Sequence, residues 1–91
     1  MELKKEIEIK NEAGLHARPA AQFVQKAGNF KSEINIIFED KEINAKSIMS
    51  LLSLGISKGK KITLIAEGED ESTAIKELVK YIEVEMPKEN N

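Results

Sequence analysis

Hydrophobic and polar residues alternate every second position in four parts of the chain. In the first of them, Leu3, Ile7 and Ile9 share one side while charged residues occupy the other. Such an alternation predicts a β-strand that buries one side and exposes the other. The alternating segments are residues 2–10, residues 32–38, a shorter stretch around Ile43, and residues 62–66. The polar residues 39–41 between the second and the third predict the turn of a β-hairpin.

Three other segments repeat their apolar residues at the spacing of an α-helix. They run from Ala17 to a stop at Gly28, from residue 46 to residue 54 before Gly55, and from a cap at Asp70 or Ser72 to Pro87. A polar cap before the first apolar residue and a glycine after the last are common helix ends. Pro19 is compatible with the first helix because a first-turn N–H makes no intrahelical hydrogen bond.

The elements follow the order βαββαβα. This order predicts an α+β open-faced sandwich, in which three helices pack on one face of a four-stranded antiparallel sheet and the other face meets water. We expect a single domain over residues 1–88 and a frayed tail at residues 89–91. Because unrelated activities share such folds, the function has to be sought in particular residues.

The composition excludes several kinds of function. Of the 91 residues, 41% are hydrophobic and 33% are charged. No apolar run approaches the roughly 20 residues of a membrane span, so we expect a soluble cytoplasmic protein. Without cysteine and with one histidine, the chain has no thiolate or histidine set for a metal ion, and nothing calls for a cofactor. The net charge of −2 is spread along the chain and aromatic residues make up 4%, which gives no sign of a nucleic acid or membrane partner.

The only histidine, His16, lies in the stretch GLHARPAA, where the first helix is predicted to begin. The first N–H groups of a helix are unpaired and the helix dipole is positive there, so this position attracts phosphate. A neutral imidazole nitrogen can attack a phosphoryl group, and the guanidinium of Arg18 matches phosphate oxygens. His16, Arg18 and the N–H groups of Ala17 and Arg18 therefore form a candidate site that accepts and returns a phosphoryl group.

A simpler interpretation of His16 is that an exposed histidine only helps to cap the helix. A serine–histidine–aspartate or two-carboxylate catalytic set finds no support, because nothing nearby in the sequence pairs with His16. Placement alone leaves capping and phosphoryl transfer both open.

The short second helix is predicted to have two apolar sides. At about 100° per residue, its apolar residues form two nearly opposite groups, Ile48, Met49 and Leu52, and Leu51 with Leu54. One group can face the core, and the other would then form an exposed patch of the kind that binds partners. Burial of both groups is the alternative. Ser47 precedes the patch, where a serine is an ordinary N-cap but where a phosphate would add negative charge beside a docking surface.

The stretch GLHARPAA resembles the phosphorylation-site signature of the histidine-containing phosphocarrier proteins of the bacterial sugar phosphotransferase system, the HPr family. The resemblance extends to the chain length, the order of the elements, NAKSIMSLLSLG at residues 44–55 and AEGEDE at residues 66–71. It covers nearly the whole chain, which makes a chance match improbable.

The resemblance implies a role for each residue of the candidate site. His16 is the phosphoacceptor and holds the phosphoryl group through Nδ1, and Arg18 contacts the phosphate. His16 receives the group from phosphorylated enzyme I and passes it to sugar-specific enzyme IIA proteins. The protein is then a carrier and not an enzyme, and we expect it to be a monomer. The implied partner surface comprises Ala17, Ala21, Ile48, Met49 and Leu52.

The resemblance also implies regulation at Ser47, because KSIM matches the segment with the regulatory serine in HPr proteins of many Gram-positive bacteria. It implies that an HPr kinase/phosphorylase modifies Ser47 and that transfer through His16 then slows. The modified form would be a corepressor for a catabolite-control transcription factor. Ser50 is a departure, because the family often has glycine there, and its hydroxyl is a second group that can accept phosphate.

Two other functions stay open. An HPr-like regulatory adaptor would act through phosphorylated Ser47 and the apolar patch, with transfer through His16 secondary. The intact His16 argues against a purely regulatory protein, since paralogues of that kind lack the histidine. A ferredoxin-like sensor would bind a small ligand, for which the sequence shows no pocket signature.

Overall fold

A computed structural model describes residues 2–88 of the chain. Its strands and helices follow the predicted order, and further helical turns extend the last helix. The strands are β1 (Glu2–Glu8), β2 (Glu33–Phe38), β3 (Lys41–Asn44) and β4 (Lys61–Glu67), and the helices are α1 (Ala17–Ala27), α2 (Ile48–Ser53) and α3 (Glu71–Lys80). The predicted tail at residues 89–91 lies outside the described residues.

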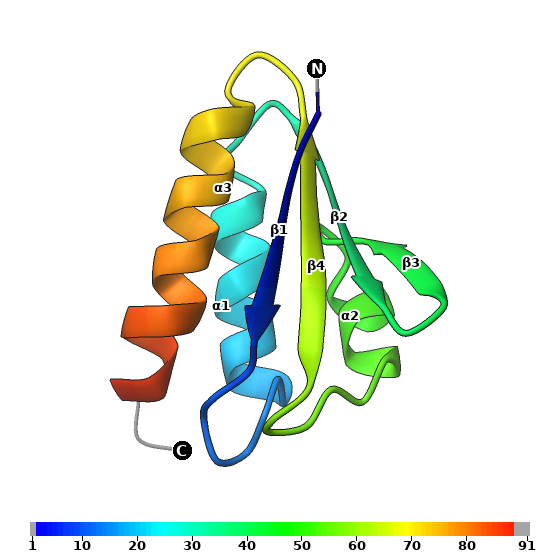
Figure 1. The fold of residues 1–91 in the computed structure, drawn as a ribbon, viewed down its shortest axis with the longest axis vertical. Helices are drawn as coiled ribbons and strands as arrows, with labels where there is room; N and C mark the ends of the chain where they lie inside the picture. Colours follow the sequence, from blue (N-terminus) through cyan, green and yellow to red (C-terminus); the bar gives the residue numbers. More distant parts are fainter. Residues whose placement is uncertain (1, 89–91) are drawn as a thin grey trace.

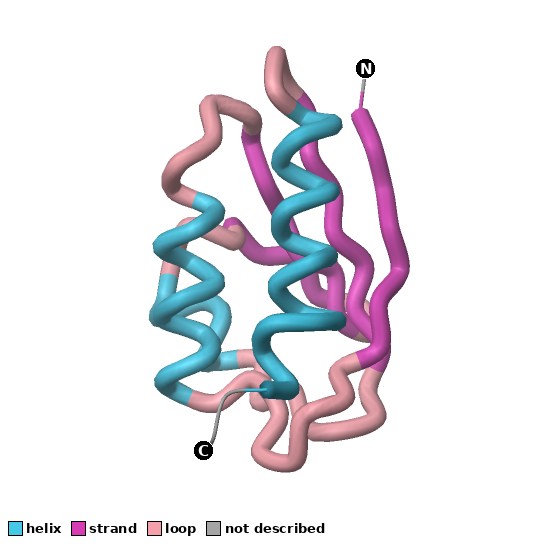
Figure 2. Tube along the Cα trace, turned by 90° about the vertical axis from the view of Figure 1, so that its left-hand side faces the viewer, coloured by secondary structure: helices cyan, strands magenta, loops and turns pink. Residues whose placement is uncertain are grey.

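The four strands form one antiparallel sheet in the order β1-β4-β2-β3. All three helices lie on one side of this sheet (Figure 1, Figure 2), and α1 contacts both α2 and α3. The predicted open-faced sandwich is therefore confirmed. The loop after β1 and the loop before β4 meet at the same end of the sheet, where α1 begins (Figure 1).

The hydrophobic core lies between the sheet and the helices. Ile36 and Leu64 pair across β2 and β4 and are fully buried, as are Phe23 of α1 and Leu78 of α3. Burial of such side chains is the main stabilising contribution to a fold of this size. Leu3, predicted on the buried side of β1, is instead 37% exposed, because β1 is an edge strand of the sheet and Leu3 lies near its end.

Several predicted boundaries differ from the structure. The first strand ends at Glu8 and not at residue 10, and the second helix spans Ile48–Ser53 and not residues 46–54. The last α-helix ends at Lys80 and not at Pro87. It continues as a π-helical turn, Tyr81–Glu85, and a 3-10 turn, Met86–Lys88. The second helix starts late because a turn at Asn44 precedes it. In this turn, Lys46 N–H bonds to the side-chain oxygen of Asn44, and Ser47 N–H bonds to the backbone carbonyl of Asn44.

Asp70 connects the loop before α3 to the segment that enters β2. Its carboxylate accepts hydrogen bonds from the Ser32 hydroxyl and, at 2.9 Å each, from the backbone N–H groups of Lys31 and Ser32. These bonds, the Ser32 hydroxyl above all, lower the pKa of Asp70 from 3.8 to about 2. Asp70 is the N-cap residue of α3, but its side chain makes no capping hydrogen bond, and Ser72 lies within the helix. The predicted cap position is therefore confirmed at Asp70, but its side chain bonds to Lys31 and Ser32 instead of to the helix.

Replacing Asp70 by asparagine should lower the thermal midpoint of unfolding, because an amide has one acceptor oxygen where the carboxylate has two. The carboxylate is more acidic in the folded chain than in the unfolded one, so its contribution is complete above about pH 4 and disappears as the pH falls toward 2. Thermal scans of the wild type and Asp70→Asn should therefore differ at pH 7 and converge near pH 2. Asp40→Asn, in the exposed hairpin turn, should match the wild type throughout. A gap that persists at pH 2 would contradict this assignment.

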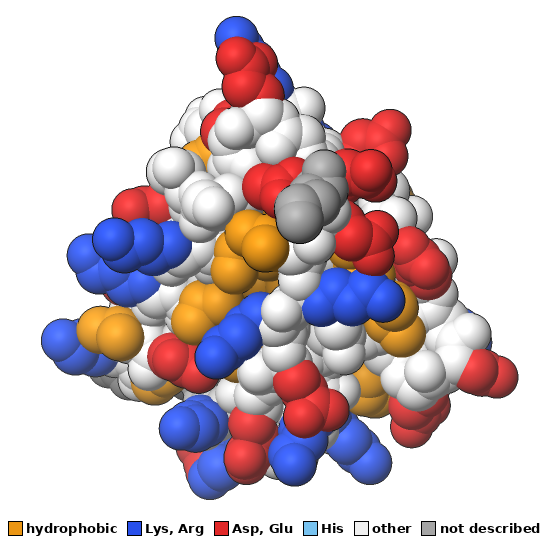
Figure 3. All heavy atoms as spheres, turned by 45° about the horizontal axis from the view of Figure 1, so that its top comes forward, with side chains coloured by type: hydrophobic (Ala, Val, Ile, Leu, Met, Phe, Trp, Pro, Cys, Tyr) orange, Lys and Arg blue, Asp and Glu red, His pale blue; other side chains and the backbone are white. Residues whose placement is uncertain are grey.

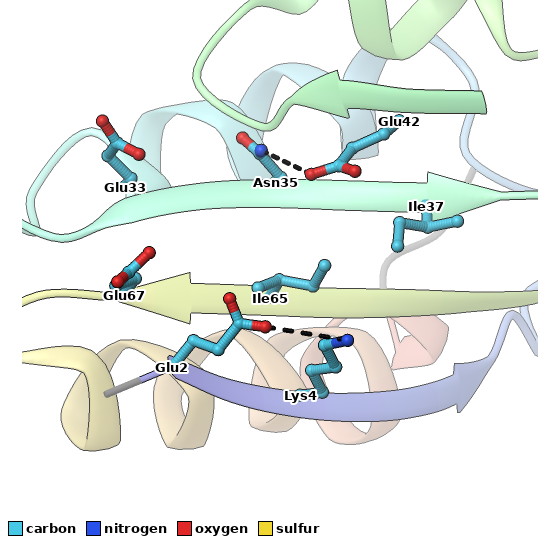
Figure 4. Close-up of a pocket in the computed structure, with 8 residues that line it drawn as sticks. All are labelled: Glu2, Lys4, Glu33, Asn35, Ile37, Glu42, Ile65 and Glu67. Carbon is cyan, nitrogen blue, oxygen red and sulfur yellow. Dashed lines mark hydrogen bonds and ion pairs between the residues drawn. The ribbon is translucent and has the colours of Figure 1, made fainter.

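The open face of the sheet carries a row of three glutamates. Glu67 of β4 lies directly opposite Glu2 of β1 on one side and Glu33 of β2 on the other (Figure 4). Like charges at paired positions destabilise a sheet. Glu2 is partly compensated by an ion pair with Lys4, with 3.6 Å between the charged groups.

Glu67→Gln should raise the free energy of unfolding by about 0.5 kcal/mol, because it removes two like-charge pairs. Urea titrations at low ionic strength would measure the gain, which should shrink as salt screens the charges. The matched control is Glu8→Gln, since Glu8 of the same sheet lies opposite Lys61 and its loss should not stabilise the protein. Equal effects of the two substitutions would show that cross-strand repulsion is not the cause.

No helix in residues 2–88 is long and apolar enough to cross a bilayer. Within the same residues, no group of three histidine, aspartate or glutamate side chains is arranged to hold a metal ion. At the end where β1 begins, charged side chains of both signs are scattered, with apolar side chains visible between them (Figure 3).

Candidate functional site

His16 is the N-cap residue of α1, as the sequence predicted. Its backbone is extended, with φ −86° and ψ −171°, and its carbonyl accepts the hydrogen bond of Ala20 N–H at 2.9 Å. The imidazole makes no capping hydrogen bond to the helix. The simpler interpretation, in which the side chain of His16 only caps α1, therefore finds no support in the contacts.

The two nitrogens of the His16 ring differ in their surroundings. Nε2 is buried and has no hydrogen-bond partner among the described residues, although the residue as a whole is half exposed. A phosphoryl group carries three oxygens around phosphorus, so it is too bulky to reach a buried nitrogen. In this orientation of the ring, an external phosphoryl group therefore cannot reach Nε2.

The first turn of α1 surrounds this position with donors. Helix geometry leaves the N–H groups of Ala17 and Arg18 without intrahelical partners, and Pro19 has no N–H. Arg18 is exposed and has no ion pair within the described part of the chain. Ala17 and Ala21 are exposed on the same helix, while the Pro19 ring is buried and holds the turn to the core. The start of α1 thus combines an imidazole, an exposed guanidinium and two backbone N–H groups without intrahelical partners.

Backbone hydrogen bonds fix the loop that leads into His16. Ile9 N–H bonds to the carbonyl of Lys60 at 2.8 Å, and Leu15 N–H bonds to the carbonyl of Ile56 at 3.0 Å. Gly14 has φ +69°, and a Cβ atom there would lie 2.5 Å from the Ile56 oxygen. Gly14 is therefore required both for its left-handed backbone and for the close approach of the two loops.

Asn11 completes this loop, and sequence reasoning missed it. Its side chain is buried, and Nδ2 donates to the carbonyl of Gly14 at 2.7 Å. The backbone carbonyl of Asn11 accepts a hydrogen bond from Gly14 N–H at 3.0 Å. Next to it, the Glu12 carboxylate pairs with Lys58 at 2.8 Å, which lowers the pKa of Glu12. An asparagine five positions before the histidine was the only sequence signal, and a loop asparagine alone does not identify such a contact.

The short helix α2 divides its apolar residues as one of the two sequence interpretations predicted. Leu51 and Leu54 are buried, whereas Met49 is 76% and Leu52 is 37% exposed. Ile48 is half-buried against the core. The alternative in which both sides are buried is therefore wrong, and Met49 and Leu52 form an exposed apolar patch on a helix that contacts α1.

Ser47 is the N-cap residue of α2. Its Oγ accepts a hydrogen bond from Ser50 N–H at 3.3 Å, which is an ordinary capping contact. The same oxygen lies 3.0 Å from the Ser50 hydroxyl. The sequence indicated the cap and the departure at Ser50, but the contact between the two hydroxyl groups appears only in the structure.

The open-faced sandwich and the histidine at the start of its first helix agree with what comparison with known proteins shows. The family model for the HPr component phosphorylation site of the phosphotransferase system matches residues 3–84. HPr-like protein Crh of Halalkalibacterium halodurans is 53% identical over 83 residues, which are 91% of this chain and 99% of the relative. Phosphocarrier protein HPr of Buchnera aphidicola subsp. Acyrthosiphon pisum is 52% identical over 73 residues, 80% and 86% of the two chains. The chain belongs to the HPr family.

Solved structures of relatives agree with this assignment. HPr of Thermoanaerobacter tengcongensis superimposes with a TM-score of 0.91 at 52% identity, covering 97% of this chain and 99% of the other. Crh of Bacillus subtilis, a catabolite repression protein solved as a domain-swapped dimer, gives a TM-score of 0.71 at 46% identity, covering 88% and 92%. The expectation of a monomer conflicts with such dimers among relatives. Phosphocarriers of the HPr family are not catalytic enzymes, and the family gives no support to the small-molecule sensor.

Gly14→Ala should destabilise the protein by about 2–4 kcal/mol. The new methyl group would overlap the Ile56 oxygen, and alanine would also be strained in the left-handed backbone conformation. Urea denaturation would measure the loss. Gly55→Ala is the matched control, since Gly55 has a similar φ of +59° but open space around it, and it should cost only about 1–2 kcal/mol. If both variants lose the same stability, the close approach of the loops at Gly14 is not a constraint.

Proposed function

We propose that this protein is a phosphocarrier of a bacterial sugar phosphotransferase system and acts in the cytoplasm. His16 accepts a phosphoryl group from phosphorylated enzyme I and passes it to sugar-specific enzyme IIA proteins. The observation that carries the proposal is the N-cap position of His16, with Nε2 buried, beside the free N–H groups of α1. Family membership supports the same role.

In this mechanism, Nδ1 of His16 attacks phosphorus through its lone pair, and the ring proton resides on Nε2. The Nδ1–P bond forms as the bond from phosphorus to the donor breaks, so the group is transferred without a change in its oxygens. Arg18 and the N–H groups of Ala17 and Arg18 bind the phosphoryl oxygens. The reverse exchange at enzyme IIA regenerates the imidazole, and Pro19 keeps the turn in place.

The apolar patch on α2 supports a partner surface next to this site. Partners would contact the exposed alanines of α1 and the apolar side chains of α2, where a large exposed Met49 adapts to more than one surface. The residues of this proposed surface are Ala17, Ala21, Ile48, Met49 and Leu52. Both groups of residues lie on neighbouring helices, which is compatible with a single docking face.

A second candidate function is that of an HPr-like regulatory adaptor. The similarity to Crh proteins favours it, together with the position of Ser47 at the edge of the α2 patch. HPr kinase/phosphorylase would phosphorylate Ser47, and the modified protein would bind a catabolite-control transcription factor. The two functions are compatible in one chain, because the phosphorylated residues differ, His16 for transfer and Ser47 for regulation, although both functions would use the α2 patch.

Incubation with enzyme I and phosphoenolpyruvate should add one acid-labile phosphate to the wild type. His16→Ala should remove the label completely, because His16 is the only histidine of the chain. Arg18→Ala should slow the transfer by about 10- to 100-fold without unfolding the protein, because it removes hydrogen bonds to a charged group. Radiolabel incorporation with time would measure both effects.

Ser47→Ala is the control for this experiment and should accept phosphate as the wild type does. Label that persists in His16→Ala would disprove the role of His16. A wild type that takes up no label from active enzyme I, but binds the transcription factor after phosphorylation of Ser47, would identify the protein as the regulatory adaptor.

A further inference from the structure

The hydroxyl groups of Ser47 and Ser50 form a hydrogen-bonded pair on one side of α2. Ser47 Oγ donates its proton to Ser50 Oγ at 3.0 Å, and it accepts from Ser50 N–H at 3.3 Å. Both residues are half-buried, whereas Met49 between them is 76% exposed. A partner that covers Met49 therefore comes close to Ser47, but it finds the Ser47 hydroxyl already engaged.

We propose that the Ser50 hydroxyl slows phosphorylation of Ser47 by holding the Ser47 proton. This inference rests on the proposed regulation at Ser47 and specifies how readily that site reacts. Ser50 does not contact the phosphate donor, so it acts as a positioning residue for the hydroxyl group of Ser47. The pair of side-chain hydroxyls carries the inference, and the N-cap contact alone would not.

The chemistry of the step explains the effect. A kinase transfers the γ-phosphoryl group of ATP, so a bond forms between Ser47 Oγ and phosphorus while the bond from phosphorus to ADP breaks. The Ser47 proton must leave to a base of the kinase. In the resting protein that proton points to Ser50 Oγ, and the hydrogen bond has to break before the hydroxyl can turn toward the kinase.

The N-cap contact poses no comparable obstacle. A hydroxyl oxygen has two lone pairs, and the Ser50 N–H occupies one of them, which leaves the other for attack on phosphorus. Alanine at position 50 keeps that N–H and removes only the hydroxyl. Since alanine also favours the helix more than serine does, Ser50→Ala is expected to fold.

Ser53 offers a matched control on the same helix. Its hydroxyl donates to the backbone carbonyl of Ser50 at 2.6 Å and not to Ser47. Ser53→Ala thus removes a hydroxyl from the same short helix without removing the bond to Ser47. Ser50→Thr restores a hydroxyl at the critical position and tests whether that group, and not the size of the side chain, is responsible.

The experiment measures phosphorylation by purified HPr kinase/phosphorylase with labelled ATP, using full-length variants below saturation and mapping the phosphorylated residue. Ser50→Ala should raise the rate constant at Ser47 by about 2- to 10-fold, the change that corresponds to one ordinary hydrogen bond. Ser53→Ala and Ser50→Thr should stay close to the wild type, and Ser47→Ala should take up no label. Circular dichroism establishes that each variant is folded.

The outcomes separate this inference from the proposed functions. Equal rates for the wild type and Ser50→Ala, or an equal rise in Ser53→Ala, would overturn the role of Ser50 while Ser47 remains the modified residue. Label on Ser50 in the wild type would overturn it as well. If no variant is labelled while a kinase-competent HPr is, both the regulation and the inference fail. Transfer from enzyme I to His16 should be equal in the wild type and the four variants, and it tests the carrier function independently.

Discussion

The backbone hydrogen bonds between residues 9–15 and residues 56–60 determine where α1 begins, and the candidate site depends on them. Leu15 N–H bonds to Ile56, and Ile9 exchanges bonds with Lys60 and Gly59 on the other loop. These bonds allow the chain to leave β1, turn at Gly14 and start the helix at His16. Without this contact, the histidine would not be held at the free N–H groups of the helix.

The second helix divides its residues between the core and the surface. Leu51 and Leu54 hold α2 on the sheet, and this leaves Met49 and Leu52 exposed beside Ser47. A six-residue helix is too short to be stable alone, so tertiary packing must maintain it. The same packing brings an exposed apolar patch and a hydroxyl pair together near α1. Phosphoryl transfer and its regulation would then occupy adjacent parts of one face.

The sequence predicted the type and order of the four strands and three α-helices, because alternation and helical spacing were both clear. Boundaries were less certain where local hydrogen bonds competed with the pattern. The side chain of Asn44 ends a strand and delays α2, and the Asp70 carboxylate bonds to Ser32 where its spacing suggested a helix cap. The contact of Asn44 is local, since Lys46 is two positions away, but the helical pattern does not reveal it. The partner of Asp70 is not encoded in local spacing, since Ser32 and Asp70 are 38 positions apart.

The sequence by itself determined the chemistry of this protein: one histidine, an arginine two positions on, and a proline that suits a first turn. These residue types and their spacing are local properties, so the family and the candidate nucleophile followed from them. Only the tertiary structure decided that Nε2 is buried, that Asn11 supports the loop, and that the Ser47 and Ser50 hydroxyls are paired. These features depend on packing and side-chain rotamers, which adjacent residues alone do not specify.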